Sequence, residues 1–196
     1  MFSVPKSTHK ECIITKLQAI NIILSSVGET ELETLENPGA DTVLAISALE
    51  RATEEIQLSG WHFNRDENYA LIPDSSGIIH IPSDVHRVVA HNSRRYVKKG
   101  SRLFDNMKNT FNIGKTVKAT VLRIIPFEDM PLTFRYYAAI RGAKKFQNST
   151  LSSSTIRSVQ EKDEAEARFA CLKEEQQVSR PTLKPLSMLK NSFSWR

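Results

Sequence analysis

Three histidines, His80, His86 and His91, lie within twelve residues of one another, a density that could hold a metal ion. Pro82 separates His80 from His86, which places these two on different extended segments. His86 and His91 are five residues apart, and in one strand such residues point to opposite faces. We therefore interpret all three as solvated or partnered strand histidines, with a metal cluster as the less favoured alternative, and predict no metal ligands.

Adjacent carboxylates occur at Glu54-Glu55, Asp66-Glu67 and Glu128-Asp129. Neighbours in sequence usually point apart, whereas a glycosidase needs two carboxylates about 5 to 9.5 Å apart across a cleft.

Gly114-Lys115-Thr116 has the last three letters of a phosphate-binding loop, but it lacks the upstream glycine and enters a predicted strand. The sequence has no GxSxG or HExxH motif. We predict no catalytic residue and no cofactor.

The composition is that of an ordinary folded chain: 196 residues, 40% hydrophobic, 25% charged and a net charge of +5. It excludes disordered, collagen-like and disulfide-scaffold classes.

Cys12 and Cys171 have neither CxxC spacing nor a flanking histidine, so we expect two buried thiols in a reducing compartment. The apolar runs are far shorter than the roughly 20 residues of a bilayer span. The N-terminal segment lacks the apolar core of a signal peptide, so we expect synthesis in a cytosol.

Apolar residues recur every three or four positions in four segments, which is the spacing of one helix face. Gly28 supplies the C-terminal stop of the first helix, and Asp41 or Thr42 can cap the second. The fourth segment has a thin apolar stripe, so much of it is expected to face water or another subunit. The predicted helices are residues 9–27, 41–59, 131–148 and 154–177.

Between the second and third helices the pattern changes to short β-branched and aromatic runs separated by turn residues. Lys98-Lys99-Gly100-Ser101 is a predicted hairpin turn, and residues 106–114 are a predicted exposed loop. Short strands in this order predict an antiparallel sheet. The runs are residues 61–63, 69–72, 78–81, 85–90, 94–97, 102–104 and 117–125.

The predicted fold class is α+β, a helical bundle of about four helices with a β-rich antiparallel insertion between helices two and three. The predicted parts are two helices in residues 1–60, the β-rich insertion in 61–127, two helices in 128–177 and a basic C-terminal tail in 178–196.

Charge is unevenly distributed along the chain. Residues 29–67 hold ten acidic and two basic residues, whereas residues 87–123 hold ten basic residues and only Asp105. The basic segment could bind nucleic acid, or it could meet the acidic segment of a neighbouring copy. The similar size of the two segments and the lack of a recognised DNA-binding motif favour the second reading. The candidates are Arg94, Arg95, Lys98, Lys99 and Arg102 on the basic face and Glu29, Glu31, Glu33 and Glu36 on the acidic face.

The C-terminal tail, residues 178–196, contains two prolines and no acidic residue. The prolines preclude one continuous helix. Large apolar side chains distinguish the tail from a purely solvating linker, so docking on a partner and fraying both stay open. The docking candidates are Leu183, Leu186, Leu189, Phe193 and Trp195.

Four segments together resemble tail tubular protein A, the adaptor or gatekeeper ring protein of short-tailed, podovirus-type bacteriophages. Their order and separation also match, and the resemblance covers most of residues 15–146. The segments are AINIILSSVGE at 19–29, IQLSGWHFN at 56–64, LIPD at 71–74 and EDMPLTFRYY at 128–137.

The same segments have physical roles independent of the family. Gly28 stops the first helix, Gly60 and Trp61 switch the chain from helix to strand, and Pro131 with Phe134 begins the third helix. We interpret these five residues as structural anchors.

The resemblance implies a homo-dodecameric ring that joins the portal protein to the nozzle, tail tubular protein B, with the tail fibre protein attached near the junction. It implies that genomic DNA contacts the ring transiently while passing through its centre during ejection. The protein is then expected in the short tail of the virion, after synthesis in the host bacterial cytoplasm. No membrane span is expected.

We therefore favour a structural ring subunit without turnover; the alternatives are an envelope glycan hydrolase carried in the tail and a nucleic-acid-binding module. A channel wall should not hold phosphates, because each neutralised phosphate strengthens binding. We expect the acidic fourth helix to lie closer to the channel than the basic segment, and the C-terminal tail to dock on the portal. The lumen-facing candidates are Glu161, Asp163, Glu164 and Glu166.

Overall fold

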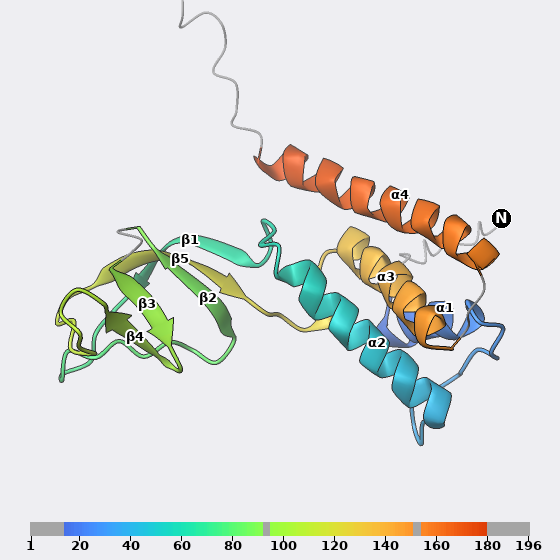
Figure 1. Ribbon diagram of the computed structural model, residues 1–196, viewed down its shortest axis with the longest axis horizontal. Coiled ribbons are helices and arrows are strands. Elements are labelled where there is room, and N and C mark those ends of the chain that lie inside the picture. The colour runs from blue at the N-terminus through green and yellow to red at the C-terminus, as the bar shows by residue number, and fades with distance from the viewer. Residues whose placement is uncertain (1–13, 92–94, 151–153, 180–196) are drawn as a thin grey trace, which may run out of the picture. The chain divides into compact units, whose positions relative to one another are not determined.

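The computed structural model describes residues 14–91, 95–150 and 154–179 (Figure 1). It has α-helices and antiparallel strands, which confirms the α+β class. In chain order the elements are α1 (Lys16–Ser25), α2 (Ala40–Gln57), β1 (Arg65–Leu71), β2 (Val85–Ala90), β3 (Tyr96–Lys99), β4 (Arg102–Asp105), β5 (Val117–Arg123), the 3-10 turn η1 (Phe127–Asp129), α3 (Leu132–Thr150) and α4 (Ser154–Ser179).

The chain divides into two compact units. A helical unit combines the chain up to Ile56 with residues 125–167, and a β-rich unit combines residues 57–124 with the chain from Arg168 onward. The division falls within α4, so each half of this helix is described with its own unit.

In the helical unit, α1 begins at a reciprocal cap and ends at a glycine. The Thr15 hydroxyl accepts from the Gln18 backbone N–H at 3.3 Å, and the Gln18 side chain accepts from the Thr15 N–H at 3.1 Å. Gly28 adopts a left-handed φ of +84°, and the next N–H returns to the Leu24 carbonyl at 3.1 Å. The helix therefore stops where the sequence predicts.

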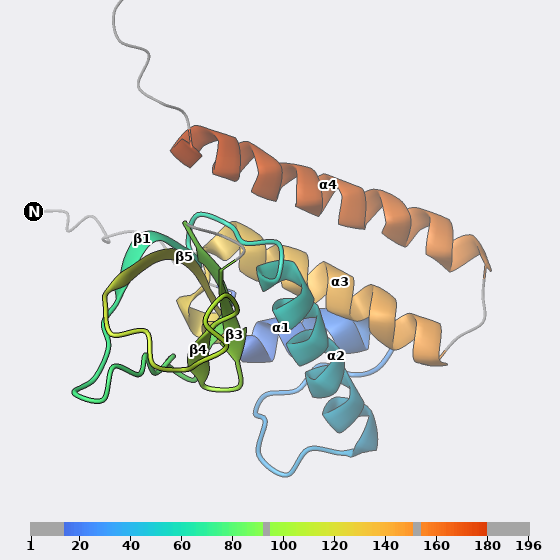
Figure 2. The same cartoon turned by 60° about the vertical axis from the view of Figure 1, so that its left-hand side comes forward.

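The three helices α1, α2 and α3 lie side by side (Figure 2), and their buried side chains are mostly apolar. A Cβ added to Gly142 would lie 2.8 Å from Ile23 Cδ1 and 3.4 Å from the Cα of Leu49. Glycine therefore lets α3 pass close to both other helices. The fully buried large side chains of this core include Ile20, Ile23, Leu49, Met130, Phe134 and Phe146.

The four helices are found where the apolar spacing predicts them, with differences at their ends. The Val43 N–H donates to the Gly39 carbonyl at 3.0 Å, so α2 begins at Ala40 and the predicted caps Asp41 and Thr42 lie inside its first turn. Asp41 there complements the helix dipole. The first helix begins at Lys16, because Thr15 caps it, so the prediction of helix at Ile14 and Thr15 is wrong, and its residues 9–13 lie outside the described chain.

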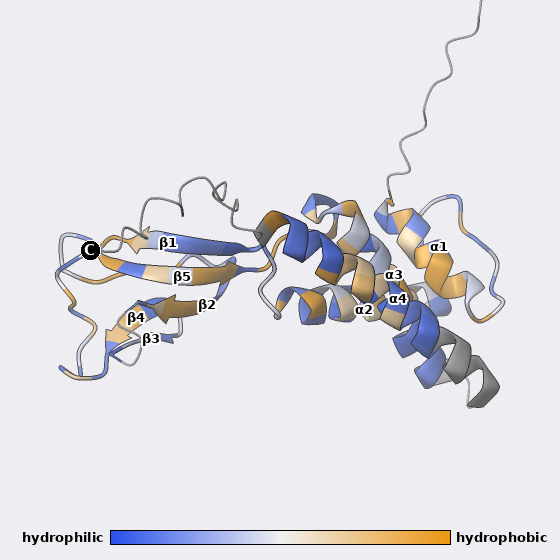
Figure 3. Cartoon of the chain, turned by 90° about the horizontal axis from the view of Figure 1, so that it is seen from above, coloured by the Kyte–Doolittle hydropathy of each residue, from blue (hydrophilic) through white to orange (hydrophobic). Residues whose placement is uncertain are grey.

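The β-rich unit holds a three-stranded antiparallel sheet in the order β1-β5-β2 and a separate β3-β4 hairpin. The central strand β5 is mostly buried and the edge strand β1 mostly exposed, a contrast visible as orange and blue in Figure 3. The β3-β4 hairpin turns at Gly100, φ +60°, inside the predicted turn of residues 98–101, but Lys98 and Lys99 of that prediction belong to β3. The core cluster includes Leu71, Ile79, Ile81, Val85, Leu103, Val117 and Val121.

Two predicted strands are wrong. Residues 61–63 form a turn, because the Asn64 side chain accepts from the Trp61 N–H at 2.9 Å and closes the chain on itself. Residues 78–81 form only isolated bridges, Ile78 with Asn112 and His80 with Arg102. Predicted strand 94–97 begins at Tyr96, and β5 ends at Arg123 rather than at residue 125.

Among the described residues, no helix has both the length and the apolar content of a membrane span.

Candidate assembly surfaces

The basic hairpin, β3-β4, is braced by an ion pair between the partly exposed Arg95 and the buried Asp105. Arg95 donates from Nε and from a terminal nitrogen to Asp105 Oδ2 at 2.9 and 2.8 Å. Asp105 is 1% exposed, and its Oδ1 accepts from the Met107 and Lys108 N–H groups at 3.0 and 3.2 Å. The Arg95 hydrogen bonds lower the pKa of Asp105, and Asp105 raises the pKa of Arg95. Arg95 is therefore neutralised inside its own chain.

The other described basic-face residues also have partners within the hairpin's unit. The Lys98 ammonium donates to the carbonyls of Val85 and His86 on the β2 strand. The Lys99 Nζ lies 3.4 Å from the centre of the Phe104 ring, and the Arg102 guanidinium lies 4.2 Å from that of Phe111. Cation–π contacts leave a charge accessible, so Lys99 and Arg102 still contribute positive charge at the surface. Arg94 lies outside the described residues.

The acidic face is an ordered loop between α1 and α2. The Asn21 side chain donates to the Leu32 carbonyl and accepts from the Leu32 N–H, both at 2.9 Å, which ties the loop to α1. All four candidate glutamates are exposed, and within the described chain none of them forms an ion pair. They are Glu29, Glu31, Glu33 and Glu36.

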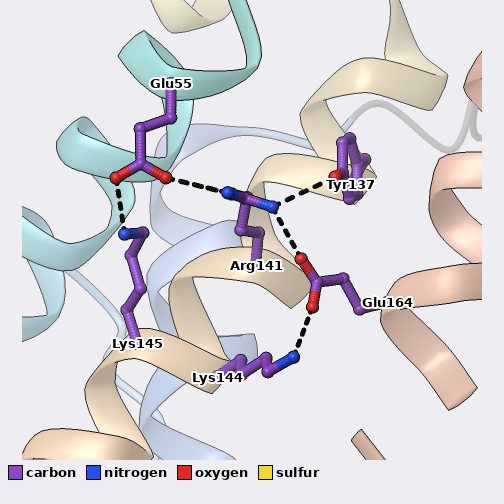
Figure 4. Close-up of polar contacts among 6 residues, drawn as sticks. All are labelled: Glu55, Tyr137, Arg141, Lys144, Lys145 and Glu164. Atoms are coloured by element: carbon purple, nitrogen blue, oxygen red, sulfur yellow. Dashed lines mark hydrogen bonds and ion pairs between the residues drawn. The ribbon is translucent and has the colours of Figure 1, made fainter. Parts of the chain in front are cut away.

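A network of ion pairs joins α2, α3 and the first half of α4 (Figure 4). Arg141 on α3 donates to Glu55 at 3.0 Å and to Glu164 at 2.7 Å. Lys145 pairs with the other Glu55 oxygen at 2.6 Å, and Lys144 pairs with Glu164 at 2.7 Å. Each carboxylate thus bridges two cations, and two cations of α3 hold Glu164 of α4.

The lumen-facing candidates therefore differ in their surroundings. Glu164 is only 16% exposed at its side chain and is bound by Arg141 and Lys144. Glu161, Asp163 and Glu166 are exposed, and Glu166 lies 3.9 Å from Lys162 one turn earlier. The exposed acidic surface on this part of α4 is therefore formed by Glu161, Asp163 and Glu166.

Acid should weaken the network in Figure 4. The pKa of Glu55 is lowered, and the hydrogen bond from Lys145 is the largest cause. The ionised Glu55 carboxylate therefore stabilises the fold at pH values above its ordinary pKa of 4.5. That contribution is lost as the pH falls below 4.5 through the lowered pKa. We expect Glu55→Gln to reduce the acid-induced fall in Tm between about pH 4.5 and 3, measured by circular dichroism. Glu36→Gln, in the exposed loop, is the control and should leave that fall unchanged; an equal effect of both variants would contradict the assignment.

Two polar sites in the β-rich unit have no clear signal in the sequence. Glu175 Oε2 accepts from His62 at its backbone N–H and lies 2.8 Å from its Nδ1, which fixes the second half of α4 to the turn after α2. Burial opposes ionisation of Glu175, but the His62 contacts lower its pKa overall. Arg123, on β5, pairs with Asp66 at 2.8 Å and with Asp84. Partners so distant in sequence cannot be read from local patterns.

The residues considered for chemistry lie apart or are held by structural contacts. His80 pairs with Asp74 at 3.1 Å, while His86 and His91 are exposed. In the described part of the chain no group of three or more His, Cys, Asp or Glu side chains could hold a metal ion. Cys171 is buried, and burial raises its pKa to about 12. Cys12 lies outside the described residues.

The structural anchors all occupy constrained positions. Gly60 has a φ of +77°, and an added Cβ would lie 3.2 Å from Leu122 Cδ1. Trp61 is 9% exposed and Phe134 is fully buried. The Pro131 carbonyl accepts from the N–H groups of Phe134 and Arg135 at 3.0 Å, and α3 begins at Leu132, so this proline lies just before the helix. The tail candidates, Leu183, Leu186, Leu189, Phe193 and Trp195, lie outside the described residues.

The features described above are charged surfaces: an acidic loop, a basic hairpin and exposed carboxylates on α4. The family model for tail tubular proteins matches residues 17–181, and the chain belongs to the tail tubular protein family. Tail tubular protein A of Klebsiella phage KP34 is 28% identical over 117 residues, which span 59% of this chain and 62% of that relative. These findings confirm the resemblance stated from the four segments. The chain is a structural component of a bacteriophage virion tail.

Proposed function

We propose that this chain is the ring adaptor that joins the phage portal to the tail nozzle and forms part of the DNA ejection channel. The family match over residues 17–181 is the observation that supports this role. The ring contains twelve copies, as the resemblance implies, and the nozzle partner is tail tubular protein B. The tail fibre protein attaches near their junction, and synthesis takes place in the host bacterial cytoplasm.

The proposed mechanism is passive and non-enzymatic. Adjacent copies fit through complementary surfaces, and the assembled wall guides DNA without turnover. Heterologous contacts of this kind close into a ring when the rotation between neighbours divides a full turn. The ordering of the acidic loop by Asn21 and of the basic hairpin by Asp105 supports this mechanism, because preformed surfaces lose less entropy on assembly.

The channel wall is proposed to include the exposed carboxylates of α4, Glu161, Asp163 and Glu166, rather than the basic hairpin. Negative side chains repel DNA phosphates and so favour passage over binding. Glu164 contributes less, because Arg141 and Lys144 neutralise it. In an assembled ring, a lumen lined by Lys99 and Arg102 would contradict this arrangement.

The C-terminal tail is proposed to dock on the portal through Leu183, Leu186, Leu189, Phe193 and Trp195. Its basic and apolar composition supports a docking role. A chain ending at Ser179 should then bind the portal more weakly than the full chain, while its helical circular dichroism per residue is kept.

The direct test is to mix the purified chain with its cognate portal and follow the product by size-exclusion chromatography and electron microscopy. We expect a stable complex in which rings of this chain cap one end of the portal. A monomeric chain before mixing is compatible with the role, because the portal can act as the template. Separate elution of both proteins at all concentrations up to the micromolar range would contradict it.

A further inference from the structure

The helical unit has a groove between the middle of α2 and the end of α3. Its volume is about 290 Å³, and it is mostly apolar. This is just below the range of ligand pockets, about 300–1,000 Å³, and suits protruding side chains better than a large ligand. The lining residues are Leu44, Ala48, Arg51, Lys145, Asn148 and Ser149.

The edge of this groove combines exposed apolar surface with a cation that lacks an acidic partner. Leu44, which lines the groove, is 52% exposed, and the preceding residue of α2, Val43, is 50% exposed. Arg51 donates only to Ser47, at 3.3 and 3.1 Å, and the described residues offer it no ion pair with a carboxylate. Lys145 adds a second positive charge, shared with Glu55. An occupant should therefore present aliphatic side chains flanked by carboxylates.

The acidic loop of this chain has that chemistry. Its sequence from Glu29 to Glu36 alternates glutamates with Thr30, Thr34 and two leucines, Leu32 and Leu35. Leu35 is partly exposed, and Glu33 and Glu36 flank it without an ion pair in the described chain. Within one copy the loop is fixed to α1 through Asn21, and none of its glutamates reaches Arg51. Among the described residues, the loop glutamates and Arg51 of the groove are thus left without an ion-pair partner, while Lys145 is paired with Glu55.

We propose that the acidic loop of one copy docks into the α2-α3 groove of a neighbouring copy, with Leu35 on Leu44 and Ala48 and with Glu33 or Glu36 paired with Arg51. This inference rests on the proposed ring and names one of its subunit contacts. It assigns the acidic face a different partner from the basic hairpin, where Arg95 is neutralised by Asp105 and Lys98 is held by backbone carbonyls. Groove and loop are different patches, so the contact is heterologous and can propagate from copy to copy.

Photo-cross-linking tests the contact directly. The photoreactive residue p-benzoylphenylalanine replaces Leu44, and the portal-templated assembly is made from equal amounts of normal and ¹⁵N-labelled chain. We expect cross-linked peptides that join position 44 to residues 29–36 and that contain one labelled and one unlabelled partner. The matched control carries the same photoreactive residue at Ile72, which is 71% exposed, and should give no link to the loop.

Charge exchange supplies a second readout. Arg51→Glu should weaken self-association about tenfold, measured by mass photometry of the assembly, because it places like charges at the contact. Glu36→Arg alone should have a similar effect, and the two together should recover most of the loss. Arg51 is exposed and pairs with no carboxylate in the described chain, so circular dichroism should be unchanged.

The outcomes separate this contact from the proposed function. If rings form on the portal but position 44 links only within one chain, to residues 95–102 of a neighbour, or to the portal, the contact is wrong while the ring role stands. If no ring forms and no mixed-label link to residues 29–36 appears at high protein concentration, both are wrong. A mixed-label link without portal binding would support the contact and contradict the adaptor role.

Discussion

Phe134→Ala is expected to lower the free energy of unfolding by about 3–5 kcal/mol. Phe134 is fully buried at the start of α3, and its N–H is bound by the Pro131 carbonyl, so the helix cannot easily shift to fill the space. The cost combines lost burial with a residual cavity. Native domains are stable by about 5–15 kcal/mol, so this variant should lose a large part of its margin and assemble poorly. Urea unfolding followed by helical circular dichroism measures the change.

Phe169→Ala is the matched control for this prediction. Phe169 is 70% exposed on α4, so its truncation should change the free energy of unfolding by no more than about 0.5 kcal/mol. Equal losses in the two variants would show that Phe134 does not anchor the helical core.

Asn64→Ala is expected to lower the free energy of unfolding by about 2–4 kcal/mol, chiefly in the β-rich unit. Asn64 is 2% exposed, and its side chain makes three hydrogen bonds of 2.9 Å. It accepts from the Trp61 N–H and donates to the carbonyls of Gln57 and Arg123, which joins the end of α2 to the turn and to β5. Alanine removes all three bonds at a site without access to water.

The fluorescence of Trp61 can report this unfolding, provided that the other tryptophan, Trp195, is replaced by phenylalanine in every variant. Asn106→Ala serves as the control, because Asn106 is exposed and its side chain forms no hydrogen bond in the described chain. A stability loss for Asn64→Ala no greater than for Asn106→Ala would contradict the bridging role.

Much of the helical architecture follows from local patterns. Apolar residues three and four apart place α1, α2, α3 and α4 within a few residues of their observed bounds over the described chain. Gly28 and Gly100 mark a helix end and a hairpin turn because both positions need a left-handed backbone. These features depend on neighbours in sequence, which a single sequence displays.

The errors arise where distant residues decide the structure. Residues 61–63 have the aromatic composition of a strand, but the buried Asn64 closes them into a turn. Glu164 belongs to an acidic run that reads as exposed, yet Arg141 and Lys144 of α3 bind it. Gly142 gave no signal, because its importance lies in the close approach of other helices. Such contacts link positions that no local pattern connects.

Electron cryomicroscopy of the intact virion tail tests the central claim most directly. The account predicts a closed ring of this chain between portal and nozzle, around the DNA channel, with the exposed carboxylates of α4 nearer the axis than Lys99 and Arg102. Density for this chain away from the portal-nozzle junction, or as isolated copies that surround no channel, would contradict it.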